Sequence, residues 1–386
     1  MTPTSLYLHV PFCAHICSYC AFNTYADMDD LQEPTVQAMA AELHAISQSR
    51  PGLPVHTVFF GGGTPSVLTP QQFRHILQTI SSSFVMTEDA EITVEANPND
   101  LDLEYCAALR GMGVNRLSIG VQSANPHELW LFDRQHDYPV AVHALENARA
   151  AGFDNISVDL IYGTPGQTLQ DWERSLRSIL ALHPEHISLY ALELKGGTRL
   201  TRDVHAGRIA PPDDDLAADM YDLATELFAA AGLQQYEISN WCLPGYESRH
   251  NRQYWLNDDY LGVGPGAHGY ANGLRYTVVR LPQRYIARMN AAASSYVYPR
   301  SPATARAVRV DRETEMQETI MMGLRLVQEG ILRERFERRF GVDLVVLKAQ
   351  VIERYTDLGL LEVLNDRVRF TREGRFLSNR VIADLI

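Results

Sequence analysis

Over the first 235 residues, short apolar runs alternate with longer amphipathic stretches. The apolar runs are rich in β-branched residues, as expected of buried strands. Six strands are predicted, at residues 5–10, 56–60, 91–96, 116–121, 156–162 and 186–192. Helices are predicted between and after them, near residues 33–49, 70–83, 101–112, 138–151, 168–182 and 214–232. This alternation indicates right-handed βαβ crossovers and a parallel sheet.

Six strand–helix units are too few for a closed eight-stranded barrel, which leaves an open barrel or a doubly wound sheet. Small and polar residues favour the barrel, because they gather where the predicted strands end. In a barrel these ends form one rim, where active sites lie. The residues concerned are Cys13, Cys17, Cys20, the glycine-rich segment 61–65, Glu95, Asn97, Gln122, Asp159 and Tyr190. We therefore predict a partial (β/α)6 TIM-like barrel.

The pattern changes twice further along the chain. Residues 236–302 are rich in aromatic residues, Asn and Gly, and are predicted to complete the barrel with loops and short strands. Residues 303–386 predict helices near 311–328, 330–340 and 344–358, two short strands around Asn365-Asp366, and a final helix. The chain is thus divided into a barrel (1–235), a barrel-completing region (236–302) and a winged-helix-like α+β module (303–386).

The charge distribution limits the classes of partner. The chain carries a net charge of −13. Residues 303–386 hold 15 Lys and Arg against 14 Asp and Glu, so residues 1–302 hold 19 against 33. A nucleic-acid-binding role, suggested by the winged-helix-like module, is disfavoured because phosphate binding needs a basic face. The sequence shows neither a run of about 18 apolar residues nor a signal peptide, so we expect a cytoplasmic protein without a transmembrane segment.

Three of the five cysteines lie within eight residues, in the order Cys13-x-x-x-Cys17-x-x-Cys20. In a reducing compartment this crowding indicates metal binding rather than disulfides. Three thiolates on one loop suit three corners of a 4Fe-4S cluster and leave the fourth iron open. The alternative is a zinc site completed by His9 or His15, because structural zinc prefers four ligands. Cys106 and Cys242 are interpreted as packing residues.

The other rim residues could bind a ligand with amino, carboxylate and hydroxyl groups. Gly62 and Gly63 permit a close approach of the backbone, although tight turns also use glycine. Glu95 and Asp159 end apolar strands, where a carboxylate is costly unless it is paired. Asp159 could instead cap a helix. Gln122 and Arg134 offer amide and guanidinium contacts, although an arginine at the surface is usually only solvated. His250, within HNRQYW, could ligate heme iron or be a hydrogen-bonded structural residue, and His268 is a second candidate ligand.

The stretches LYLHVPFCAHICSYCAF, FFGGGTPS, VEANP, GVQS and DLIYGTPGQT resemble the oxygen-independent coproporphyrinogen III oxidase-like radical SAM proteins. The resemblance covers essentially the whole chain. It implies a 4Fe-4S cluster held by Cys13, Cys17 and Cys20, with S-adenosylmethionine (SAM) bound at the open iron. The matching positions imply SAM contacts from Tyr7, Tyr19, Gly62, Gly63, Thr64, Glu95, Gln122, Arg134, Asp159 and Ala191.

Two branches of that family differ near the cluster. The coproporphyrinogen dehydrogenases, which are radical SAM decarboxylases, have a longer N-terminal extension and a fourth cysteine two residues after the third. This chain has Phe22 there and carries the HNRQYW stretch, so it resembles the heme chaperone branch. That resemblance implies binding of heme, covalent or not, and its transfer to acceptor hemoproteins such as membrane respiratory enzymes. A homodimer also agrees with the resemblance. The resemblance agrees both with a core that cleaves SAM and with one that only binds it.

Overall fold

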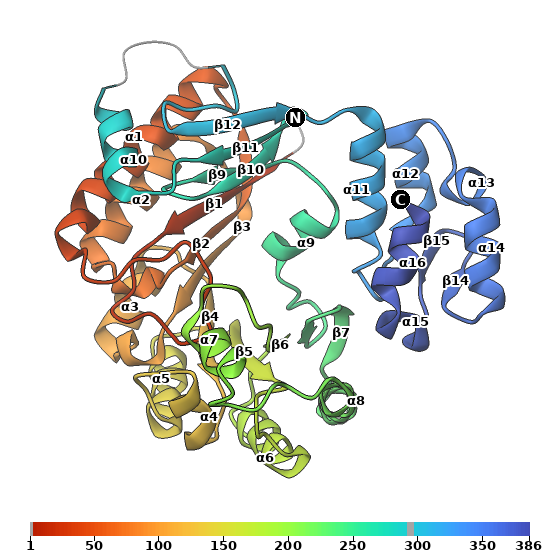
Figure 1. Cartoon of the computed structure of the whole chain (residues 1–386). Helices are drawn as coiled ribbons and strands as arrows, with labels where there is room; N and C mark the ends of the chain where they lie inside the picture. The colour runs from red at the N-terminus through yellow and green to blue at the C-terminus, as the bar shows by residue number, and fades with distance from the viewer. Residues whose placement is uncertain (1–2, 292–296) are drawn as a thin grey trace.

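The computed structural model describes residues 3–291 and 297–386. The six predicted strands form a continuous parallel array, which confirms the partial barrel. They are β1 (Thr4–Val10), β2 (Pro54–Gly62), β3 (Val85–Ala96), β4 (Arg116–Gln122), β5 (Ile156–Tyr162) and β6 (His186–Ala191). The crossover helices are α1 (Gln32–Ser49), α2 (Pro70–Ser83), α3 (Leu103–Gly111), α5 (Tyr138–Ala150) and α6 (Leu169–Leu180), and α8 (Asp214–Ala230) follows β6. Figure 1 shows most of these helices along one side of the strands.

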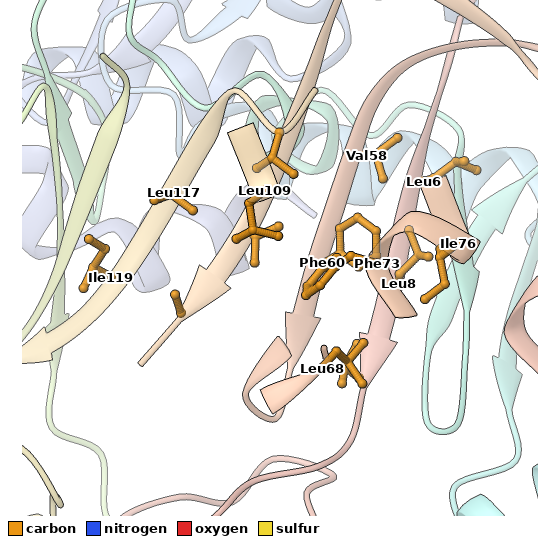
Figure 2. Packing of buried hydrophobic residues seen from close by; sticks show 14 of the residues in the cluster. Leu6, Leu8, Val58, Phe60, Leu68, Phe73, Ile76, Leu109, Leu117 and Ile119 are labelled. Carbon is orange, nitrogen blue, oxygen red and sulfur yellow. The ribbon is translucent and has the colours of Figure 1, made fainter. Parts of the chain in front are cut away.

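Side chains of successive strand residues point to opposite faces, so each strand has a helix-facing and an inner side. Leu6 and Leu8 belong to the core between strands and helices, together with Phe60 on β2 and Phe73 on α2. Figure 2 shows these side chains converging. The intervening positions of β1, among them Tyr7, therefore face the interior of the barrel. The period of the hydrophobic positions in the sequence determines which side of each strand faces the helices.

The region after α8 extends both edges of the sheet to twelve strands. At one edge, β8 (Asn240–Cys242) pairs with β6, and β7 (Gln234–Glu237) pairs with β8. At the other edge, β9 (Tyr260–Val263) lies parallel to β1. It is followed outward by β10 (His268–Ala271), β11 (Leu274–Val278) and β12 (Thr304–Arg309), all antiparallel to their neighbours. Helix α10 (Pro282–Asn290) packs on α1. The two edge strands β12 and β7 do not pair, so the barrel is open.

Some elements differ from the sequence-based expectation. Helices α4 (Pro126–Leu131) and α7 (Arg199–His205) were not predicted, because six or seven residues are too few to show a helical period. The strand β12 belongs to the large sheet, so the C-terminal unit begins after it rather than at residue 303. The predicted helix at 344–358 is divided into α13 (Leu344–Leu347) and α14 (Ala349–Asp357).

The C-terminal module has a hydrophobic core of its own. Its three-stranded sheet contains β13 (Ile331–Leu332), β15 (Arg367–Phe370) and β14 (Leu361–Val363). Its remaining helices are α11 (Arg312–Gly323), α12 (Arg333–Phe340), α15 (Arg372–Phe376) and α16 (Ser378–Leu385). The module lies beyond α9 (Arg249–Trp255) from the barrel (Figure 1). Arg335 donates to Asp258 at 2.7 Å, and Arg339 donates to the carbonyl of Asn257 at 2.9 Å, which joins the two parts.

Candidate functional site

The three clustered cysteines lie on the loop that follows β1, at the rim formed by the C-terminal strand ends. All three are free thiols and half-buried. The backbone of Cys20 donates to the carbonyl of Cys17 at 3.1 Å, and that of Cys13 donates to the carbonyl of Tyr25 at 3.0 Å. Burial raises the pKa of Cys13 to about 11 in the absence of a metal. Iron ligation would offset this effect, because a bound metal stabilises thiolate.

Two neighbouring side chains point donor groups at these thiols. The hydroxyl of Thr64 donates to Cys13 Sγ at 3.3 Å. The Nη1 of Arg134 lies 3.5 Å from Cys17 Sγ, and its Nη2 donates to the carbonyl of Gly120 at 2.7 Å. Such donors stabilise thiolate sulfur and tune the reduction potential of a cluster. The structure thus brings Thr64 and Arg134, both predicted rim residues, against the cysteine loop.

A contact that the sequence did not reveal holds the middle of this loop. The Ser18 hydroxyl donates to the carbonyl of Leu131 at 2.7 Å, and the Ser18 amide donates to the carbonyl of Phe132 at 3.0 Å. The amide of Leu200 in turn donates to the carbonyl of Ser18 at 2.9 Å. Ser18 is therefore fixed between the end of α4 and the start of α7. Neither short helix was predicted, so this support had no signal in the sequence.

The glycine-rich turn after β2 lies against the same loop. Gly62 has φ +111°, and a Cβ there would meet the imidazole of His9 at 2.5 Å. The amide of Gly63 donates to the carbonyl of Val10 at 2.7 Å, and that of Thr64 donates to the carbonyl of Phe12 at 2.8 Å. These N–H groups hold the cysteine loop and are therefore unavailable to a ligand. A ligand amine would have to use the carbonyl oxygens of the turn.

The two predicted strand-end carboxylates lie on the inner face of the barrel. Glu95 accepts the amide N–H of Gly62 at 3.2 Å. The hydroxyl of Ser118 donates to both carboxylate oxygens of Asp159, at 3.0 and 3.1 Å. Burial, and then the charge of Asp159, raise the pKa of Glu95 to about 8. Burial also raises the pKa of Asp159, against the effect of its serine partners. Asp159 lies in the middle of β5, so its predicted position at the strand end was wrong. It caps no helix, which excludes the capping alternative.

Arg134 has one polar atom that remains without a partner. Its Nε is buried and makes no hydrogen bond within residues 3–291 and 297–386. A buried guanidinium N–H without an acceptor is costly, and it suits a carboxylate of a bound ligand. Nearby, Gln122 ends β4 with φ +68°, and the ring of Tyr19 lies edge-on to Phe132 at 5.0 Å between centroids. These positions fit a site that receives a small zwitterion such as SAM.

The two remaining predicted SAM contacts lie on different strands of the rim. The hydroxyl of Tyr7 donates to His9 Nδ1 at 3.0 Å, because His9 Nε2–H is engaged by the carbonyl of Asn23 at 3.0 Å. Tyr7 therefore faces inward beside the cysteine loop. Ala191 is exposed at the C-terminal end of β6, across the rim.

The zinc alternative is not supported by the histidines that it requires. Both nitrogens of His9 are hydrogen-bonded, as described above. Nε2 of His15 pairs with Asp133 at 3.1 Å. The donor set is three thiols on one loop, which fits a cluster with an open iron better than a closed zinc site.

His250, the first candidate heme ligand, lies inside the barrel away from the rim. It is fully buried on α9. Its Nδ1 is hydrogen-bonded to the hydroxyl of Thr57 at 2.8 Å and its Nε2 to that of Tyr254 at 2.9 Å. The ring also stacks on Phe59, with centroids 4.9 Å apart. Both nitrogens are thus in use, and this arrangement favours the alternative of a structural histidine. The burial results from α9 packing against β2, which no local pattern could reveal.

Cys106 and Cys242 are both buried and belong to the packed interior. The side chain of Phe22, two residues after Cys20, is 74% exposed beside the cysteine loop.

Among the helices of the described residues, none combines the length and apolar character needed to cross a membrane.

Comparisons with known proteins agree with this geometry. Residues 7–179 match the family model of the radical SAM superfamily, and residues 310–377 match that of the HemN C-terminal domain. The heme chaperone HemW of Mycobacterium tuberculosis is 38% identical, over 100% of this chain and 95% of that protein. HemW of Bacillus subtilis is 36% identical, over 98% of this chain and 97% of that protein. Coproporphyrinogen III oxidase (HemN) from Escherichia coli shares the fold, with a TM-score of 0.84 at 22% identity over 99% of this chain and 90% of that chain.

Proposed function

The chain belongs to the HemW family of radical SAM proteins, and from this membership we propose that it binds heme and transfers it to acceptor hemoproteins. The observation that carries the proposal is the similarity, along the whole chain, to relatives named heme chaperone HemW. Phe22 adds support, because the related dehydrogenases have a cysteine at this position. The likeness to HemN is a likeness of fold and does not extend to its reaction.

Membership of the radical SAM superfamily implies a 4Fe-4S cluster and SAM. We propose that Cys13, Cys17 and Cys20 ligate three irons and that SAM occupies the fourth. The cluster would supply one electron to bound SAM. The proposed SAM-contacting residues are Tyr7, Tyr19, Gly62, Gly63, Thr64, Glu95, Gln122, Arg134, Asp159 and Ala191. The free thiols and the unpaired Nε of Arg134 support this assignment.

Within this proposed site, the basic and the acidic side chains occupy different positions. Arg134 places a cation between Cys17 and the inner face, where its Nε–H would donate to the carboxylate of SAM. Glu95 and Asp159 lie deeper and would accept hydrogen bonds from hydroxyl or amino groups. Glu95 keeps a proton near neutral pH until such a group arrives, because its pKa is raised to about 8. The site therefore presents positive charge at the cluster side and a protonated Glu95 within the barrel.

We also propose which proteins accept the heme, where in the cell they are reached and which oligomeric state is functional. The acceptors would be hemoproteins, including respiratory enzymes of the membrane, reached from the cytoplasm. A homodimer that depends on the cluster would be the functional form. The acidic charge of residues 1–302 supports the exclusion of nucleic acid as a partner.

The test uses the full chain with its cluster reconstituted under anaerobic conditions. Heme and coproporphyrinogen III are supplied in separate assays. We expect stoichiometric heme binding and transfer of that heme to an apo-hemoprotein, followed by the gain of acceptor activity. Formation of protoporphyrinogen at catalytic rates would instead identify a dehydrogenase. Absence of heme binding by the loaded protein would also contradict the proposal.

A further inference from the structure

His268 is the first residue of β10 and lies at the rim of the barrel. In the register, Tyr270 pairs with Tyr260, and Tyr260 pairs with Ser5 on the inner face of β1. Residues that pair across strands share a face, as do residues two apart on one strand. His268 is therefore on the inner face, at the end of β10 nearest to the cysteine loop. Unlike His250, its side chain is exposed.

The imidazole of His268 is available to a ligand. It makes no hydrogen bond or ion pair to any residue in 3–291 and 297–386. Partial burial and the charges of Arg280 and Arg275 lower its pKa, so the ring is neutral at neutral pH. A neutral imidazole is the form that ligates heme iron. His250 offers no such lone pair, because both of its nitrogens are hydrogen-bonded.

Arg280 follows β11 at the same rim and provides a positive charge beside His268. Its Nε donates to the side-chain oxygen of Asn23 at 3.0 Å, which orients the guanidinium. Its Nη groups have no hydrogen-bond partner among the described residues. Asn23 also donates to the carbonyl of Pro265 at 3.0 Å, which joins the cysteine loop to the segment before His268. A guanidinium held in this way suits the carboxylate of a heme propionate.

Phe22 supplies an exposed aromatic side chain at the same rim. Phe22 precedes Asn23 and exposes 74% of its side chain. An exposed phenylalanine is costly in water, and a flat apolar macrocycle would cover it. A neutral imidazole, an oriented guanidinium and an exposed aromatic ring, all at the rim, match the three parts of heme: its iron, its propionates and its porphyrin face.

We propose that His268 is the axial ligand of the heme iron and that Arg280 binds a heme propionate. The inference rests on the proposed function and identifies where on the barrel the cargo is held. The iron accepts an electron pair from an imidazole nitrogen, and no redox change is required. Heme bound there lies at the same rim as the cluster, whereas a site at His250 would lie within the barrel.

The experiment uses the full chain with its reconstituted cluster, titrated with hemin and recorded as difference spectra and EPR. We expect His268→Ala to abolish the imidazole-ligated heme signal and to raise the Kd at least about tenfold. Added imidazole should restore the signal, because it replaces the missing ligand. His127→Ala, which removes another exposed histidine near the rim, should leave both unchanged. Thermal unfolding and cluster absorbance check that each variant is folded.

The propionate contact is tested separately with Arg280→Gln. This variant should weaken hemin binding about tenfold and keep the spectrum of the ligated iron. Heme dimethyl ester, which has no free carboxylate, should bind the variant and the original chain equally. If His268→Ala keeps both the original spectrum and the original affinity, the ligand assignment is overturned while the heme-binding function stands. If the unmodified protein binds no heme, both are overturned.

Discussion

The carboxylate of Glu91 on β3 accepts the backbone N–H of His250 at 3.0 Å, and this contact holds α9 inside the barrel. A second oxygen of Glu91 accepts the N–H of Arg249 at 3.0 Å. The first N–H groups of a helix have no partner within the helix, so a carboxylate placed there stabilises it. The HNRQYW stretch is therefore held at its start by β3 and packs His250 against β2. Its position in the fold indicates an architectural role beneath the proposed SAM site.

Removal of the Glu91 carboxylate should weaken the attachment of α9 to the inner face of the barrel. We expect Glu91→Ala to lower the free energy of unfolding by about 1–3 kcal/mol, because two helix N–H groups lose their acceptor in a buried position. Urea unfolding followed by circular dichroism measures the change. Glu88→Ala is the matched control, because Glu88 lies on the same strand but is exposed. Equal stabilities of the two variants would contradict the role assigned to Glu91.

The glycine turn should tolerate no side chain at Gly62. Gly62→Ala would place a Cβ 2.5 Å from the His9 ring, so we expect weaker cluster incorporation and destabilisation of about 2 kcal/mol or more. Gly113→Ala is the control, because Gly113 has a similar φ of +97° but no atom within 4 Å of the added Cβ. The difference between the variants isolates the close approach from the backbone strain. Iron content and thermal unfolding provide the readouts, and identical behaviour of both variants would refute the steric argument.

Iron binding should depend on the rim cysteines and not on the buried ones. We expect Cys17→Ala to lose most of the about four irons per chain that a full cluster supplies. Cys106→Ala should keep them and lose only about 1 kcal/mol of stability, because it removes one buried sulfur. Iron and sulfide analysis after anaerobic reconstitution measures both. Iron content that falls equally in the two variants would argue against ligation by the loop.

The raised pKa of Glu95 predicts a pH dependence of stability. Its pKa of about 8 lies above the ordinary carboxyl range, so the folded state holds the proton more tightly than the unfolded chain. The resulting stabilisation is complete at low pH and is lost as the pH rises toward 8. Glu95→Gln stays neutral and keeps an acceptor for the Gly62 amide. We therefore expect its melting temperature, relative to the original chain, to increase between pH 5 and pH 8. Curves of melting temperature against pH that run parallel for Glu95→Gln and the original chain would contradict the shifted pKa.

The sequence by itself determined the elements of the barrel and the side of each strand that meets the helices. The six strands, the five crossover helices and α8 were predicted, because the local hydrophobic period reports which residues are buried. The rim position of Cys13 and the place of Glu95 near the end of β3 followed from the same pattern, since parallel strands end at one edge, whereas Asp159 lies in the middle of β5. These features depend on residues that are close together along the chain.

Only the tertiary structure decided which distant residues meet. Ser5 pairs with Tyr260 across 255 residues, and this pairing brings His268 to the rim. Helix α9 packs on β2 and thereby buries His250, although the surrounding HNRQYW motif had made this histidine the first candidate ligand. Register and burial depend on long-range packing, which leaves no periodic signal in the local sequence. The sequence could therefore name two candidate histidines, but the fold determines which of them has a nitrogen free to bind iron.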